Sequence, residues 1–233
     1  MSLAPKNHLL RITVAVFALC WATAAFGQSL EEIKTKAGAG DAFSELQLAF
    51  RYEYGQGVAK NPAEAVKWFR KAAEQGQPIA QSSLGWHYYF GQGVAKDYRE
   101  AVKWYRKAAE QGYSGAQVLL GISYSEGQGV AKDDREAVKL YRKAAEQGHP
   151  DAEVLLGDCL ASFMPLAKGV AKDDKEAVKW YRKAAEQGQP RAQHALGLFY
   201  ARGLGVAKDE VESYKWSLLA AAQGDGDASL WHG

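Results

Sequence analysis

The sequence contains few side chains that could carry out catalysis or hold a metal ion. No serine is followed three residues later by a lysine, and the chain has no H-E-x-x-H, K-T-G or S-D-N sequence, the patterns that supply activated serines or zinc ligands in many hydrolases. The Gly-Gln-Gly triplets precede no G-K-[ST] sequence, so they are turns and not phosphate-binding loops. None of the five histidines is spaced from a cysteine or another histidine as zinc ligands are. We expect no catalytic residue, no metal and no cofactor.

The two cysteines offer no further chemistry. Cys20 lies in an apolar run and follows Leu19, where a lipoprotein signal needs a small residue, so we expect no lipid anchor. Cys159 follows Asp158 in the least regular part of the chain, and we expect a buried, unreactive thiol.

The first residues have the pattern of an export signal. Lys6, His8 and Arg11 precede the apolar run 12–26, and Ala25-Phe26-Gly27 places small residues where a signal peptidase cleaves. We expect cleavage after Gly27 and a periplasmic or secreted protein, or an extracellular or ER-luminal one in a eukaryote. The alternative is an uncleaved anchor, although the run is shorter than the roughly 20 residues that span a bilayer.

The charge of the exported part is balanced. Removal of residues 1–27 lowers Lys plus Arg from 29 to 27, which equals the 27 Asp plus Glu. A chain with no net charge lacks the basic surface that binds nucleic acid or anionic lipid. After removal of Cys20, a single cysteine also excludes an internal disulfide.

A repeated phrase fills most of the chain. Its shared valine recurs at spacings of 36, 36, 40 and 36 residues, at Val58, Val94, Val130, Val170 and Val206. A fixed period of this length is typical of a solenoid, in which each unit buries its apolar face against the next.

Each unit is expected to form two helices. The second, helix B, has a capping-box pattern such as Asp97 with Glu100, an apolar stripe that includes Trp104, and a terminating Gly112. The first, helix A, runs from Ala80 to about residue 90 in the second unit and is expected to be shorter. A glycine recurs in its middle at a cost of about 1 kcal/mol relative to alanine, which predicts close packing between the helices.

Residues 80–112, "AQSSLGWHYYFGQGVAKDYREAVKWYRKAAEQG", resemble the Sel-one-like repeat, a relative of the tetratricopeptide repeat. The resemblance implies an all-α, right-handed α-solenoid of antiparallel two-helix repeats that acts as a scaffold for protein interactions, with helix A lining the concave surface. We expect five repeats, a capping helix within 28–40 and a truncated C-terminal segment at 225–233. The repeat boundaries are 41–76, 77–112, 113–148, 149–188 and 189–224.

Helix B is nearly constant along the chain, whereas helix A varies on the side opposite its repeated Ala, Leu and Tyr. These variable positions are the candidate partner-binding residues: Leu46, Phe50, Tyr54, Trp86, Tyr89, Phe90, Val118, Ile122, Asp158, His194, Leu198 and Arg202. The aromatic members in the first two repeats would form an apolar groove larger than a monomer usually exposes without purpose. The alternative is that neighbouring repeats cover these rings as part of the core.

We therefore expect a non-catalytic, monomeric scaffold that holds a peptide or a partner helix on its concave face. A lysine row beside the helix B caps (Lys60, Lys96, Lys132, Lys172 and Lys208) is expected to be a solvated loop face, and the alternative is contact with an acidic partner. The alternative function, taken from the cysteine-rich relatives of this family, is β-lactam binding or weak hydrolysis. The missing serine motif and the missing paired cysteines argue against it.

Overall fold

The computed structural model describes residues 28–162 and 167–223 of the 233-residue chain. These residues form helices joined by turns and loops, and they contain no strand. The chain divides into two compact units, unit 1 (Met1–Ala116) and unit 2 (Gln117–Gly233), each of which is described by itself. The predicted export signal and C-terminal segment, residues 1–27 and 225–233, lie outside the described residues.

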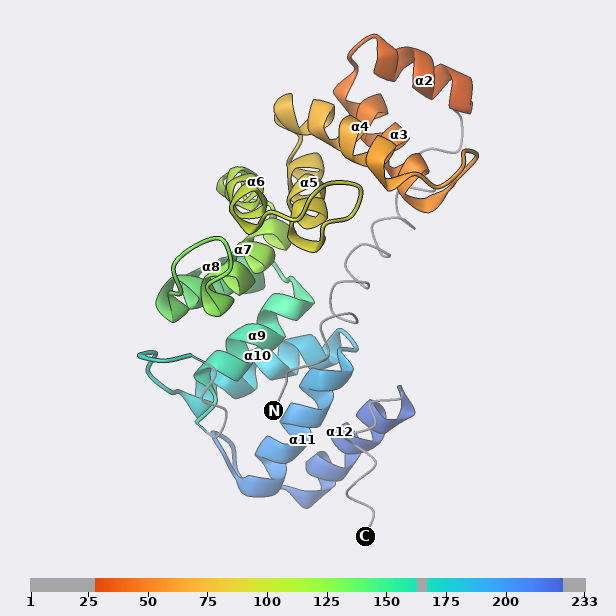
Figure 1. The fold of residues 1–233 in the computed structure, drawn as a ribbon. Helices are drawn as coiled ribbons and strands as arrows, with labels where there is room; N and C mark the ends of the chain where they lie inside the picture. Colours follow the sequence, from red (N-terminus) through yellow and green to blue (C-terminus); the bar gives the residue numbers. More distant parts are fainter. Residues whose placement is uncertain (1–27, 163–166, 224–233) are drawn as a thin grey trace. The chain divides into compact units, whose positions relative to one another are not determined.

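Helices follow one another in pairs, as the solenoid prediction requires, and Figure 1 shows the partners of each pair side by side. Unit 1 contains the single helix α2 and the pairs α3/α4 and α5/α6: α2 (Leu30–Gly38), α3 (Ala42–Tyr54), α4 (Pro62–Glu74), α5 (Pro78–Phe90) and α6 (Tyr98–Glu110). The next helix begins in unit 1 and continues into unit 2, which contains α7 (Ser114–Glu126), α8 (Asp134–Glu146), α9 (Pro150–Leu160), α10 (Asp174–Glu186), α11 (Pro190–Arg202) and α12 (Glu210–Ala222). The all-α fold of paired helices is confirmed, and the right-handed sense of the superhelix stays a prediction.

Helix A is longer than the sequence analysis predicts. In the second repeat it is α5, which begins at Pro78 and has 13 residues, as many as its partner α6. Proline at the first helical position needs no hydrogen-bond partner and has a backbone already suited to a helix, so the helix starts two residues before Ala80.

The helix B caps are present, but half of the predicted capping box is not formed. The Asp97 side chain accepts from the backbone amides of Arg99 and Glu100 at 2.8 and 3.1 Å. The Asp97 amide donates instead to the Tyr88 carbonyl of helix A at 2.9 Å, and Glu100 pairs with Lys103. The cap residue therefore ties helix B to the helix before it as well as starting its own.

The recurring glycine of helix A permits the close packing that its repetition predicts. A Cβ atom added to Gly85 would lie 2.6 Å from the Tyr105 ring of helix B. The same approach is seen between Gly121 and Tyr141, at 2.5 Å. Real Cβ atoms do not come so close to a ring, so a side chain at these positions would push the two helices apart.

A partly buried hydrogen bond joins the two helices within each repeat. In repeat 2, Gln111 at the end of α6 donates its side-chain amide to the Gln81 side chain at 2.8 Å. Gln81 in turn donates to the Ala73 carbonyl of the preceding repeat at 3.1 Å. The corresponding bond within the other repeats links Gln75–Glu45, Gln147–Gln117, Gln187–Glu153 and Gln223–Gln193. One polar side chain thus connects three helices of the stack.

Candidate functional site

The structure buries three of the twelve candidate residues. Leu46, Val118 and Asp158 have exposed fractions of 1%, 6% and 1%, so the prediction that they line an open surface does not hold. The cause is that helix A packs on more than one neighbour: α3 contacts α2 and α4, and α9 contacts α8 and α10. More of the circumference of helix A is therefore buried than the stripe of repeated Ala, Leu and Tyr residues indicates.

In unit 1 the structure brings the five aromatic candidates together. Tyr54 is 39% exposed, and Phe50, Trp86, Tyr89 and Phe90 are half-buried. Their rings form two groups of contacts, one in each repeat. Neighbouring ring centroids are 6.1 Å apart for Phe50 and Tyr54, 4.9 Å for Trp86 and Phe90, and 4.9 Å for Tyr89 and Phe90. We call these five residues, together with Tyr98, the aromatic surface.

Two buried residues, Phe69 and His87, connect the rings of repeat 1 with those of repeat 2. Phe69 contacts Phe50 at 5.0 Å and the His87 ring at 5.4 Å, and His87 contacts Trp86 at 5.4 Å. Phe69 and His87 are 1% and 2% exposed. The His87 ring is itself fixed, because Nδ1 lies 2.8 Å from the Gln92 carbonyl and Nε2 lies 3.1 Å from the Glu53 carboxylate. The rings of the aromatic surface therefore pack against buried core residues on one side and remain partly exposed to solvent on the other.

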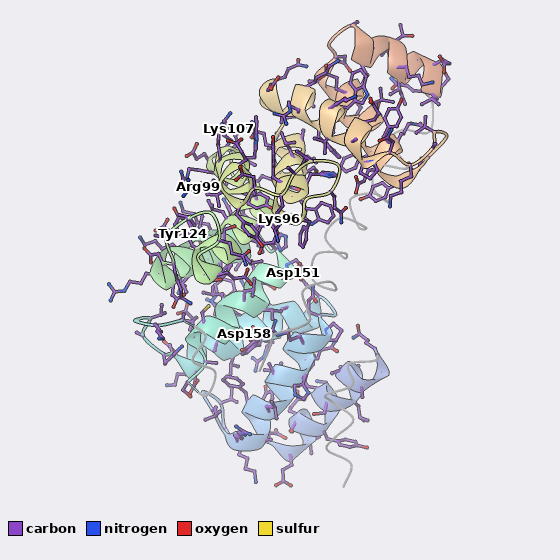
Figure 2. All side chains as sticks on the ribbon, in the orientation of Figure 1. Lys96, Arg99, Lys107, Tyr124, Asp151 and Asp158 are labelled. Carbon is purple, nitrogen blue, oxygen red and sulfur yellow. The ribbon has the colours of Figure 1, made fainter. Side chains whose placement is uncertain are left out.

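Tyr98 extends the second group beyond the candidates. Its ring lies 5.0 Å from that of Tyr89, and the Lys96 ammonium group lies 4.4 Å from the centre of the Tyr98 ring. Lys96 projects from the loop before α6 (Figure 2). Tyr98 is not among the candidates predicted from the sequence, although a comparison of the repeats at this position sets it apart. The first position of helix B is proline or an acid in the other four repeats: Pro62, Asp134, Asp174 and Glu210.

The unit 2 candidates do not form a similar group. Ile122, His194 and Leu198 are half-buried, and Arg202 is exposed. Asp158 stands at the helix A position that Trp86 occupies in repeat 2. It accepts a hydrogen bond from the Tyr181 hydroxyl at 2.7 Å and pairs with Arg191 of the next repeat. Burial raises the pKa of Asp158, while Arg191 and Tyr181 oppose the rise.

Two more carboxylates are buried on α9, and Figure 2 shows Asp151 on this helix together with Asp158. Burial raises the pKa of Asp151 to about 6, against the hydrogen bond from Gln189. Burial also raises the pKa of Glu153 to about 7, against Lys183 and the hydrogen bond from Gln187. Because the pKa values of these buried acids are higher in the folded than in the unfolded protein, the stability of this repeat depends on pH.

The thiol of Cys159 is buried, and burial raises its pKa to about 12. A thiol with this pKa stays protonated at neutral pH and is a poor nucleophile, in agreement with the expectation of an unreactive cysteine. Within residues 28–162 and 167–223, no three His, Cys, Asp or Glu side chains are grouped so that they could hold a metal ion. The described helices include none that is both long and apolar enough to cross a membrane.

Comparison with known proteins gives the family. The model of the Sel1 repeat matches five successive stretches, residues 42–77, 78–113, 114–149, 150–189 and 190–225. Over 67 residues the chain is 41% identical to the secretory immunoglobulin A-binding protein EsiB of Escherichia coli. This match covers 29% of the chain and 14% of EsiB.

Two crystal structures share the fold. One is c5321, a protective antigen present in uropathogenic Escherichia coli strains displaying an SLR fold, with a TM-score of 0.80 and 38% identity over 85% of this chain and 42% of that one. The other is a Sel1 repeat protein from Oxalobacter formigenes, with a TM-score of 0.75 and 35% identity over 86% of this chain and 76% of that one. The chain spans less than half of EsiB and of c5321. The five matched repeats and the shared fold agree with the helix pairs described above, and the chain belongs to the Sel1-repeat family.

Proposed function

We propose that the protein is a non-catalytic scaffold that binds an extended peptide or a helix of a partner protein on the aromatic surface of unit 1. The observation that carries this proposal is a pair of accessible ring clusters, Phe50 with Tyr54 and Trp86 through Tyr98, which the buried rings of Phe69 and His87 join. Aromatic side chains that are fixed from below and open on one edge supply large contact areas at a small entropic cost, as binding hot spots do. In unit 2, the accessible candidates Ile122, His194, Leu198 and Arg202 are assigned the same role.

The family supports a protein partner. Sel1-repeat proteins generally serve as protein-interaction scaffolds, and EsiB is named for binding secretory immunoglobulin A. Because the match covers only 14% of EsiB, that partner is not assigned to this chain. β-Lactam hydrolysis gains no support, since no serine has the lysine that would activate it and the Cys159 thiol is buried.

We also propose that the protein is exported and that residues 1–27 are removed. The charged start, the apolar run and the small residues before Gln28 support this proposal. Mass spectrometry of the protein from its native source should give an N-terminus at Gln28. An intact Met1 would contradict cleavage without affecting the binding proposal.

Photo-crosslinking tests the binding surface. A photoreactive phenylalanine analogue is placed at Phe90, and a matched control places it at Lys103, an exposed residue of α6. In an envelope fraction, position 90 should give a discrete crosslinked product that the control lacks. Trp86→Ala should remove this product while costing only about 1–2 kcal/mol of stability, as expected for a half-buried ring. Identical products from both positions would contradict the proposal.

A further inference from the structure

The helix B tyrosine of repeats 2, 3 and 4 reaches under helix A of its own repeat. In repeat 4 the Tyr181 hydroxyl donates to Asp158 at 2.7 Å, and in repeat 3 the Tyr141 hydroxyl donates to Ser125 at 3.4 Å. In repeat 2 the residue is Tyr105, which is 1% exposed. Its hydroxyl is buried and has no hydrogen-bond partner among the described residues. Native proteins rarely leave such a group unpaired, so it points to a missing acceptor.

A second unpaired donor lies at the position that Asp158 occupies in repeat 4. This residue is Trp86, whose indole Nε1 is shielded from solvent and has no acceptor within the described part of the chain. An indole N–H can only donate. Repeat 4 therefore contains a donor and a carboxylate acceptor at these two positions, whereas repeat 2 contains two donors.

We propose that repeat 2 binds the carboxylate of an aspartate or glutamate side chain of the protein partner, with the Trp86 indole and the Tyr105 hydroxyl as donors. The inference rests on the proposed function, since it names the chemistry that the partner offers to the aromatic surface. The partner's carboxylate takes the place that Asp158 holds within repeat 4.

The surroundings favour an acidic side chain with apolar neighbours. Lys96 places a cation at the end of the aromatic surface, over the Tyr98 ring. The two acidic residues that follow Lys96 in the sequence already have other partners, because Asp97 caps α6 and Glu100 pairs with Lys103. A carboxylate accepts from both donors and is attracted by the lysine, while the rings of Phe90 and its neighbours cover apolar flanking residues.

Binding requires a movement of the Trp86 side chain, because neither donor atom is accessible to solvent in the free protein. The indole is half-buried and packs against the rings of Phe90 and His87 at 4.9 and 5.4 Å. An outward turn would vacate the helix A position from which Asp158, its counterpart in repeat 4, reaches the tyrosine hydroxyl, so an acceptor could reach the Tyr105 hydroxyl there. Pairing two buried donors that are unpaired in the free protein gives the bound state a specific advantage.

The first test uses the free protein and compares Tyr105→Phe with Tyr181→Phe. Tyr105→Phe should leave the melting temperature within about 1 °C or raise it, because it removes an unpaired group. Phenylalanine is already present at this position in repeat 1, as Phe69. Tyr181→Phe should lower the melting temperature by several degrees, because it removes the donor to Oδ1 of the buried Asp158 and leaves only Arg191, which bonds Oδ2. An equal loss in both variants would show that the Tyr105 hydroxyl is already paired, and would overturn the proposal.

The second test selects random dodecapeptides displayed on phage against the protein. Peptides that lose binding with Trp86→Ala should carry Asp or Glu between apolar residues, and changing that acid to its amide should weaken binding by about tenfold or more. Trp86→Phe and Tyr105→Phe should abolish the preference for the acid over the amide, whereas Tyr141→Phe should not. Trp86-dependent peptides without an acid would overturn this inference and leave the proposed function standing. The absence of any Trp86-dependent peptide would overturn both.

Discussion

Replacing Glu153 by glutamine should stabilise the protein at pH 8. Glu153 is 1% exposed and stands where repeats 2, 3 and 5 have glutamine (Gln81, Gln117 and Gln193). Gln187 donates to its carboxylate at 2.8 Å, a bond that a glutamine oxygen can also accept. A glutamine side chain also has an N–H donor, which the ionised carboxylate lacks, and this donor could bond to the Ala145 carbonyl of the preceding repeat. At the equivalent position of repeat 2, Gln81 makes this bond to the Ala73 carbonyl at 3.1 Å.

The magnitude follows from the pKa of Glu153. Burial raises this pKa from 4.5 to about 7, so the folded protein binds the proton more tightly than the unfolded chain does. The contribution of Glu153 to stability is therefore most favourable below pH 4.5, falls as the pH rises from 4.5 to 7, and stays at its low value above 7. At about 1.4 kcal/mol per pKa unit, the rise from 4.5 to about 7 corresponds to a penalty at pH 8 of at most about 3.5 kcal/mol. We expect Glu153→Gln to recover about 1–3 kcal/mol at pH 8 and less than about 1 kcal/mol at pH 4.

Urea denaturation followed by circular dichroism at pH 4 and pH 8 measures both values. The matched control is Gln193→Glu, which buries a new carboxylate and removes the bond from Gln193 to the Ala185 carbonyl. It should destabilise the protein at pH 8 by a similar amount. The reasoning is refuted if Glu153→Gln gives no gain at pH 8, or gives the same gain at pH 4.

Three further predictions concern packing and reactivity. Gly85→Ala should cost about 1–3 kcal/mol, because the new Cβ would meet the Tyr105 ring at 2.6 Å, whereas Gly38→Ala, with no atom within 4 Å, should be neutral or stabilising; equal shifts of the urea midpoint would contradict this. Trp104→Ala should lose about 3–5 kcal/mol, since the side chain is 5% exposed and leaves a cavity; an unchanged midpoint would place Trp104 outside the core. The pKa of Cys159 is raised to about 12, so this thiol should react with a thiol reagent at pH 8 only after denaturant is added. If mass spectrometry of the peptide that contains Cys159 shows labelling in the folded protein, the burial argument is refuted.

The sequence predicted the parts of the fold that depend on local signals. The Asp97 cap, the terminating glycines and the helix period each reflect interactions within a few residues, and each was found. The close approach at Gly85 was also predicted, because a repeated glycine inside a helix needs a packing reason.

Other features depend on neighbours that periodicity does not reveal. Leu46 and Val118 seemed to face away from the core because a single helix shows only its own stripe, whereas helix A is covered from several sides. The Asp97 amide bonds to the Tyr88 carbonyl rather than to Glu100, which no local pattern indicates. Tyr98 joined the surface from helix B, the helix that the sequence analysis treated as constant.

The contacts between repeats bear on how such a chain can change during evolution. Gln81 bonds to the Ala73 carbonyl and Gln193 to the Ala185 carbonyl, each in the preceding repeat, so these junctions are built alike. A duplicated or deleted repeat would meet a compatible neighbour at such a junction, and recombination can lengthen or shorten the array without a new interface. The junction between repeats 4 and 5 contains this shared bond and also an additional ion pair, between Asp158 and Arg191. Separating these two repeats would leave a buried carboxylate without its cation, so repeats 4 and 5 should be inherited as one block.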